Sequence, residues 1–462
     1  MCGREPMGRR TRVWLVGLLL VLSDLALPAR SPALESSPLR ERAQRRPAAR
    51  EILPQTQPRR PSARTRRLSQ RQRARQKARR RAALQRRLAR LDASLRRASA
   101  AAIQRDDLRG EDPEVREAAL AALRGHAGTV VVMDPYSGRI YSIVNQEWAV
   151  RKGFKPCSTI KLVVGLAALK EGLIDARTPL PLGGGSIAMN LIEALAHSNN
   201  QYFEIIGEQL GRATLLQYAR EWGLGQPTGI NLPRESAGRL PSERPPASRR
   251  WRATPTVGRL ASHGDGFAVT ALQLATLTSA IVNGGTLYRP YVVRREMEHP
   301  TPIVRRSLNL PAEHRESLIA GMIAAVEYGT AKLAYVPGIT FAGKTGSCRS
   351  DSLWLGLFTS FAPVSNPRLV VTVIVQGRYE RGSTAASIAG HIYQRLAHRL
   401  ALPSTAGPSQ VPPECSLSPP FTDQPENAPP PPEGEAKPEP LPSPIEHFTP
   451  RRKHAYESRS IP

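Results

Sequence analysis

The sequence predicts an α+β fold: an antiparallel sheet drawn from both ends of the folded region, flanked by helices, with an all-helical subdomain. Two strand-like segments, residues 129–133 and 139–144, lie near the start of this region. Three more, residues 341–346, 353–361 and 369–375, follow one another near its end. Between the two groups the pattern is mostly helical, over residues 158–325. A sheet from both chain ends with helices between them is an α+β layer arrangement.

The elements follow from local patterns, taken in chain order. Residues 113–123 place alanines and leucines on one helical face. Residues 134–138, with the sequence DPYSG, have the turn chemistry of a hairpin between the first two strands. Apolar helical stretches follow at residues 162–169, 191–196 and 313–326. The last three strands alternate closely enough with turns to form a meander.

Composition divides the 462 residues into four regions. Residues 1–29 have a basic start and an apolar run over 13–22, too short for a bilayer-spanning helix of about 20 residues. We therefore expect a signal peptide, with an uncleaved anchor as the alternative, and an exported protein of the periplasm or the outer membrane face. Residues 30–109 form an arginine-rich arm, 110–402 the folded domain, and 403–462 a proline-rich disordered tail.

The arm carries most of the formal net charge of +28. Residues 30–99 contain 22 arginines and Lys77 against four acidic residues. Residues 71–102 lack proline and favour a helix, with leucines at 84, 88, 91 and 95. This helix could lie on a membrane, form a coiled coil or lean against the domain as a solvated helix. Its charge suits anionic lipid or cell-wall polymer; nucleic acid is not expected for an exported chain.

A serine nucleophile is predicted at Ser158, in the S-x-x-K pattern that ends at Lys161 and opens an apolar helix. Residues three apart share a helix face, so the lysine amine would lie beside the serine hydroxyl. A neutral lysine can take the hydroxyl proton, and burial or a nearby cation would lower its pKa enough to keep it neutral. Alone, the pattern is equally that of a helix cap and a surface lysine.

A second pattern is the only K-T-G of the chain, Lys344-Thr345-Gly346, followed by Ser347 on a predicted strand. Lysine and threonine on an edge strand suit a substrate carboxylate, and the glycine keeps the edge clear. The strand edge would also offer N–H and C=O groups to an extended peptide. An ordinary turn is the alternative for these residues taken alone.

The third pattern, S-x-N, occurs twice between the other two, at Ser198 to Asn200 and at Ser307 to Asn309. We choose Ser198, because it follows the helical stretch 191–196 at a corner between helices, where a hydroxyl can face a cleft. Ser307 is expected in a loop before the helix at 313–326.

Together, in this order, the three patterns resemble those of the penicillin-recognising serine enzymes. The stretches TGINLPRE (228–235), GDG (264–266) with VTALQLA (269–275), and NGG (283–285) also resemble that family. Thr270 and Gln273 among them form a capping-box pattern. The resemblance covers roughly residues 112–400 and implies a penicillin-binding D,D-transpeptidase domain with a β-lactamase-like fold.

The resemblance implies a role for each matching residue. Ser158 would attack the D-Ala-D-Ala carbonyl of a peptidoglycan stem peptide, Lys161 would be the base, and Ser198 would relay a proton to the leaving amine. Asn200 would hold the acyl chain, Lys344 and Thr345 the carboxylate, and the N–H groups of Ser158 and Ser347 the oxyanion. β-Lactams would acylate the same serine. No cofactor and no metal are implied.

Cys157 and Cys348 flank these residues. If the N–H groups of Ser158 and Ser347 point at one oxygen, the neighbouring cysteines come near the Cα separation of a disulfide, about 4.4–6.8 Å. The two positions also resemble the disulfide of carbapenem-hydrolysing class A β-lactamases. We expect a Cys157–Cys348 bond; two buried thiols are the alternative.

Three other functions compete with transpeptidation. A β-lactamase would hydrolyse the acyl-enzyme, but the 146 positions from Ser198 to Lys344 resemble transpeptidases, and no glutamate motif for a deacylating water is evident between them. A D,D-carboxypeptidase would use water as acceptor, and an acylatable β-lactam sensor would use the arm. The arm is too short and too polar for a glycosyltransferase, so glycan polymerisation is expected from a partner.

His197 and His263 are interpreted as surface or packing residues.

Overall fold

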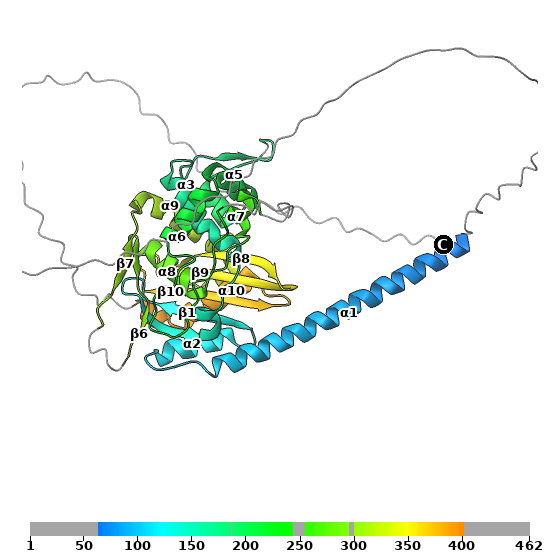
Figure 1. Ribbon diagram of the computed structural model, residues 1–462, viewed down its shortest axis with the longest axis horizontal. Coiled ribbons are helices and arrows are strands. Elements are labelled where there is room, and N and C mark those ends of the chain that lie inside the picture. Colours follow the sequence, from blue (N-terminus) through cyan, green and yellow to red (C-terminus); the bar gives the residue numbers. More distant parts are fainter. Residues whose placement is uncertain (1–62, 186, 244–254, 295–299, 402–462) are drawn as a thin grey trace, which may run out of the picture. The chain divides into compact units, whose positions relative to one another are not determined.

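A computed structural model describes residues 63–185, 187–243, 255–294 and 300–401 (Figure 1). The chain divides into two compact units, residues 1–81 and 82–462. In the first unit the described residues belong to helix α1 (Ala63–Ile103), whose C-terminal part belongs to the second unit. The predicted signal or anchor and the proline-rich tail lie outside the described residues. None of the described helices is both long and apolar enough to span a bilayer.

The described elements of the second unit follow in chain order. Its other helices are α2 (Pro113–Leu123), η1 (Glu147–Arg151), η2 (Cys157–Ile160), α3 (Lys161–Lys170), α4 (Leu191–Ala196), α5 (Asn200–Leu210), α6 (Arg212–Glu221), α7 (Val257–His263), α8 (Ala271–Val282), α9 (Ala312–Glu327), η4 (Lys332–Ala334), α10 (Gly382–Arg395) and α11 (Ala397–Ala401). Its strands are β1 (Gly128–Met133), β2 (Arg139–Val144), β3 (Leu180–Leu182), β4 (Ile187–Met189), β5 (Thr286–Tyr288), β6 (Tyr291–Val292), β7 (Val304–Ser307), β8 (Ala342–Ser350), β9 (Leu353–Ala362) and β10 (Leu369–Gly377).

The main sheet joins both ends of the folded region, as the sequence predicts. Its strand order is β6-β2-β1-β10-β9-β8, and β1 pairs antiparallel with both β2 and β10. In Figure 1 the yellow and orange strands of the C-terminal half lie beside the cyan strand β1. The sheet is mixed rather than wholly antiparallel, because β6 pairs parallel to β2. A two-residue strand carries no alternation, so the sequence gives no sign of it.

Both faces of this sheet are covered, and β1 shows how. Val131 and Met133 join a core formed largely with the helical subdomain and α8. Val130 and Val132 point the other way and pack with residues of α2 and α10. Successive side chains of a strand point to opposite faces, so an apolar run buried on both sides separates two helical layers.

The middle of the chain is mostly helical but contains two short strand pairs that the sequence analysis missed. Helix α4 packs on α9, α5 on α7, and α3 on α5. Strands β3 and β4 pair with each other, as do β5 and β7. Ser307, expected in a loop, ends β7 opposite Thr286. Strands of three or four residues are too short to show a period of two.

The helix predicted over residues 71–102 is present as α1, and its C-terminal turns lean on the domain. Ser99 is fully buried, and its hydroxyl accepts hydrogen bonds from the Gly128 N–H and the Asn145 amide. The Asp92 carboxylate accepts from the Arg378 backbone N–H at 2.8 Å. Ser99 and Asp92 lie before residue 110, the predicted start of the folded domain. The folded part of the second unit therefore begins earlier and includes the last turns of α1.

Two of the sequence stretches noted above form structural devices. The Glu235 carboxylate accepts hydrogen bonds from the Thr228 and Gly229 N–H groups and so closes the 228–235 loop. The predicted capping box is present at the start of α8, where Thr270 and Gln273 exchange side-chain-to-backbone bonds of 3.0 Å. All of α8 is buried, so its first N–H groups need such partners.

Candidate active site

Ser158 lies at the second position of the 3₁₀ turn η2, which runs directly into α3 at Lys161. The expected helix start is therefore a tighter turn. Cys157, the residue before it, has the left-handed φ of 49°. Such a backbone conformation is costly for a residue with a side chain and concentrates at functional sites. Ser158 is partly exposed while its neighbours Cys157 and Thr159 are buried, so the turn presents one hydroxyl to solvent.

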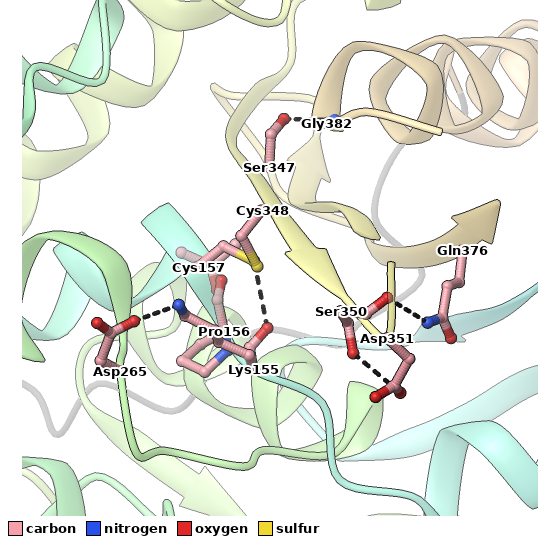
Figure 2. The surroundings of a disulfide bond; sticks show 11 residues. Lys155, Pro156, Cys157, Asp265, Ser347, Cys348, Ser350, Asp351, Gln376 and Gly382 are labelled. Carbon is pink, nitrogen blue, oxygen red and sulfur yellow. Dashed lines mark hydrogen bonds and ion pairs between the residues drawn. A yellow bond between two sulfur atoms is a disulfide. The ribbon is translucent and has the colours of Figure 1, made fainter. Parts of the chain in front are cut away.

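Two connections hold this turn in place, and Figure 2 shows both. A disulfide joins Cys157 to Cys348 of β8, with a Cα–Cα distance of 5.8 Å. On the other side, Lys155 forms an ion pair with Asp265, which also pairs with Arg259 at 2.7 Å. The segment before the nucleophile is thus tied both to the sheet and to the end of α7.

The Lys161 side chain is fully buried and points to the corner between α4 and α5. Its Nζ donates to the Ser198 carbonyl at 2.7 Å and to Asn200 Oδ1 at 2.8 Å, and it lies 3.3 Å from Ser198 Oγ. Among the described residues, no hydrogen bond joins Nζ to the Ser158 hydroxyl. Catalytic hydrogen bonds are often long before substrate binds and tighten in the complex. The lysine therefore links the predicted S-x-x-K and S-x-N patterns.

Ser198 occupies the helix corner chosen for it by sequence, between the end of α4 and the start of α5. It has a left-handed φ of 54°. Asn199 caps α5 by accepting from the Tyr202 N–H at 2.9 Å. The corner turns the Ser198 hydroxyl and the Asn200 amide toward Lys161.

Strand β8 forms the edge of the main sheet and carries the K-T-G pattern. The Lys344 side chain is fully buried, and its Nζ donates to the Thr345 carbonyl at 3.2 Å. Gly346 faces η2 so closely that an added Cβ would lie 3.0 Å from the Pro156 carbonyl oxygen and 3.3 Å from Cys157 Cβ. A larger residue would push the nucleophile turn away from the strand.

The two lysines are buried, and no carboxylate of the described residues is bonded to either. Burial lowers the pKa of Lys344 to about 7. Burial and then the Lys344 cation hold the pKa of Lys161 well below its usual 10.5, and Glu204 acts in the raising direction. Because each cation disfavours the other, the pair suits one neutral and one charged amine.

A cleft of about 320 Å³ brings the patterns together. Its lining residues are Ser158, Ser198, Asn200, Thr330, Thr345, Ser347, Arg381 and Ser383. Three of these residues, Thr330, Arg381 and Ser383, lie in no recognisable sequence pattern and could not be predicted. Thr330 shares a 2.6 Å hydrogen bond with Thr345, and the Gly382 N–H donates to Ser347 Oγ at 2.8 Å. Among the described residues, no cluster of three potential metal ligands is present.

His263, interpreted from sequence as a surface or packing residue, is partly exposed and lies beside Asn200. Because Asn200 Oδ1 accepts from Lys161, its Nδ2 is the donor toward His263 Nε2, 3.4 Å away. The other ring nitrogen, Nδ1, is 2.6 Å from Ser262 Oγ, which donates to Glu204 at 3.1 Å. For Asn200 to donate to Nε2 and Ser262 to donate to Glu204, the imidazole must be neutral, with its proton on Nδ1 donated to Ser262 Oγ.

Comparisons with known proteins agree with this geometry. The family described as "Penicillin binding protein transpeptidase domain" matches residues 128–394, more than half of the chain. The chain belongs to this family. Its resemblance to penicillin-recognising enzymes is thus confirmed as membership of the penicillin-binding-protein transpeptidases.

Named relatives cover the same region. The chain is 31% identical over 287 residues to "Stage V sporulation protein D" of Bacillus subtilis, covering 54% of this chain and 43% of that protein. It is 26% identical over 369 residues to "Peptidoglycan D,D-transpeptidase MrdA" of Acinetobacter baumannii, covering 63% and 54%. The chain thus spans about half the length of these relatives.

Solved structures show the same fold. The transpeptidase domain of penicillin-binding protein 3 from Burkholderia pseudomallei has a TM-score of 0.53 at 20% identity, covering 64% of this chain and 98% of that one. Pseudomonas aeruginosa PBP2 in complex with WCK 5153 has a TM-score of 0.55 at 24% identity, covering 62% and 77%. At these identities the likeness establishes the fold alone, and it confirms the predicted fold class.

Proposed function

We propose that this protein is a penicillin-binding D,D-transpeptidase that cross-links peptidoglycan stem peptides through an acyl-Ser158 intermediate. The observation that carries the proposal is one cleft in which Ser158, the Ser198–Asn200 corner and Thr345 converge from three separate segments. Family membership and the names of the relatives support the same reaction class.

The first half-reaction is acylation. Ser158 Oγ attacks the carbonyl between the last two D-Ala residues, and neutral Lys161 takes the hydroxyl proton. The N–H groups of Ser158 and Ser347 stabilise the oxyanion. Ser198 passes a proton to the leaving amine, free D-Ala departs, and the acyl group remains on Ser158. Lys344 and Thr345 hold the terminal carboxylate, and Asn200 holds the acyl chain.

The second half-reaction transfers the acyl group to the amine of another stem peptide. That amine attacks the ester carbonyl, loses a proton to neutral Lys161 and displaces Ser158, whose hydroxyl regains its proton from Lys161. The disulfide and the close approach of Gly346 to η2 favour this chemistry, because they fix the two oxyanion donors relative to each other.

Hydrolysis of the acyl-enzyme, as in a β-lactamase, is less well supported. Deacylation by water needs a base near the ester, and none of the described residues that line the cleft carries a carboxylate. A carboxypeptidase, also using water, and a β-lactam sensor remain the other outcomes of the test.

A fluorescent penicillin tests the proposal. Wild type should be labelled at Ser158 and keep the label for many minutes, whereas Ser158→Ala should stay unlabelled. Incubation with a stem pentapeptide and an amine acceptor should release D-Ala and form a cross-linked product. Rapid loss of label would identify a β-lactamase, D-Ala release without cross-linking a carboxypeptidase, and stable labelling without any D-Ala release a sensor. Labelling of Ser158→Ala would refute the assignment of the nucleophile.

We further propose that the protein works outside the cytoplasm beside a separate glycosyltransferase, with its basic arm on anionic lipid. Arginines exposed along α1 support the arm's role. Removing residues 30–81, which leaves the docked turns of α1 in place, should release the protein from vesicles containing phosphatidylglycerol. Unchanged vesicle binding would contradict the lipid, and retained binding to isolated cell wall would favour a polymer instead.

A further inference from the structure

Two arginines, one of which lines the cleft, lie on the ring of Trp354. The Arg381 guanidinium carbon is 3.3 Å from the ring centroid and that of Arg349 is 5.0 Å from it. Arg381 also lines the cleft together with Ser158. We call Arg349 and Arg381 the arginine pair.

The strand geometry places this pair in line with the proposed peptide-binding edge. Thr345, Ser347 and Arg349 alternate along β8 and therefore share one face of the edge strand. Arg349 lies opposite Trp354 in the β8–β9 register. The edge thus leads from the proposed carboxylate position at Thr345, past Ser347, to the arginines.

The position of Arg381 is fixed by a close backbone contact. Ser347 pairs with Gly356, and a Cβ on Gly356 would lie 2.1 Å from the Arg381 carbonyl oxygen. Gly382, which follows Arg381, donates its N–H to Ser347 Oγ. Only glycine at 356 lets the loop before α10 approach this closely, and this approach brings the Arg381 guanidinium over Trp354.

Neither arginine is neutralised within the described part of the chain. No salt bridge involves either guanidinium, and Arg349 donates instead to the Ser352 carbonyl at 3.0 Å. Both side chains are exposed. Two like charges held on one indole ring leave an excess of positive charge at the cleft, which favours an anionic ligand.

We propose that the arginine pair binds a second carboxylate of the acyl donor, borne one or two residues before the D-Ala that becomes attached to Ser158. This inference rests on the proposed function. With the reactive carbonyl at the Ser347 N–H, the pair lies two strand positions further on, or about 7 Å at roughly 3.3 Å per residue. The donor's terminal carboxylate lies on the opposite side, at Lys344 and Thr345. The pair would therefore select donors that have a free acid at this point.

The test compares two synthetic stem pentapeptides that differ only in whether the side-chain or α-carboxylates of residues two and three are free or amidated. Wild type should release D-Ala from the free-acid donor roughly fivefold to tenfold faster in kcat/KM, a size expected for charge-assisted bonds in a partly open cleft. Arg381→Gln should reduce this preference to near unity, and Arg349→Gln should reduce it partly. The exposed Arg395→Gln, at the other end of α10, is the matched control and should keep the preference.

Penicillins separate failure of this inference from failure of the proposed function. Benzylpenicillin has a neutral acyl side chain, carbenicillin a carboxylate and ampicillin an ammonium group. Arg381→Gln should slow acylation by carbenicillin relative to benzylpenicillin and speed it for ampicillin, while benzylpenicillin itself still acylates, which shows that the variant is folded. An unchanged ratio in both peptide and penicillin series would overturn the inference. Absence of acylation by all three penicillins in wild type would overturn the proposed function.

Discussion

At the scale of single residues, the most informative feature is the pair of buried lysines. Burial lowers the pKa of Lys344 to about 7, from the usual 10.5. Between these values the unfolded chain binds more protons at this position than the folded protein, so this lysine's contribution to stability improves as pH rises through that window. Below about pH 7, both states carry the charge and the burial penalty is complete.

Lys344→Met should therefore stabilise the fold while abolishing peptide turnover. We expect a gain of roughly 1–3 kcal/mol in unfolding free energy at pH 6.5. The gain should shrink at pH 9, because the wild-type lysine is then mostly neutral. Urea unfolding at the two pH values checks this, and an equal gain at both would contradict the role of charge.

His263 gives the second residue-scale prediction. Its pKa is lowered from 6.5 by burial and then by Arg259; Asp265 and Glu204 act in the raising direction and Lys161 in the lowering one. Protonation at Nε2 removes the acceptor for Asn200, so acylation should weaken as pH falls through this pKa. In His263→Gln, which accepts without titrating, the variant-to-wild-type ratio of penicillin acylation should rise roughly twofold to threefold from pH 7.5 to 5.5.

His197→Gln is the matched control, because His197 is exposed and pairs with Glu193 outside the cleft. Its ratio should not change with pH. A flat ratio for His263→Gln would mean that the imidazole only fills space.

The cleft residues that could be predicted from sequence lie in short patterns, and those that could not reach the cleft through tertiary contacts. Ser158, Lys161 and Lys344 stand in patterns whose spacing has a chemical reason. Arg381 and Thr330 reach the cleft through tertiary contacts alone, and no local signal marks them. The contact of His263 with Asn200 could not be predicted, because the two residues are 63 positions apart in the chain.

At the scale of elements, the decisive contact is that of η2 with β8. The double variant Cys157→Ser/Cys348→Ser should lose about 2–4 kcal/mol of stability, since a bridge across 191 positions restricts the unfolded chain. Its penicillin acylation should also slow, because the nucleophile turn is no longer tied to the strand. Thermal unfolding with and without reductant checks this.

Reductant should lower the melting temperature of wild type to that of the double variant and leave the variant unchanged. Equal melting of both proteins without reductant would show that the cysteines are unpaired in solution.

Element boundaries were predictable for strands and helices with clear periodicity, such as β9 and α9. Short strands such as β6 were not, since two residues carry no period.

At the scale of the whole molecule, the sequence placed the start of the folded domain too late. The Asp106 carboxylate accepts from the Asn145 and Gln146 N–H groups and pairs with Arg116, each at 2.8 Å. The buried Ser99 hydroxyl accepts hydrogen bonds from the Gly128 N–H and the Asn145 side-chain amide. Composition alone assigned these positions to the basic arm, because tertiary hydrogen bonds leave no trace in composition.

A chain of residues 110–402 should therefore be less stable than one of residues 82–402, by about 2–4 kcal/mol, because buried donors lose their partners. Urea denaturation of the two proteins measures the difference. Ser99→Val within 82–402 should reproduce part of it without changing the length. Equal midpoints for both lengths would show that these turns of α1 add nothing.

The neighbouring positions of β1 and β10 also determine when this protein can fold. Gly128 of β1 pairs with Val375 of β10, and these two strands lie in the middle of the sheet. The central hydrogen bonds of the sheet therefore cannot form until a strand almost 250 positions after β1 has been made. A ribosome must synthesise nearly all of the domain before this pairing can form. Such long-range closure is slow, so a newly made chain remains without its central strand pairing until its last strand has arrived.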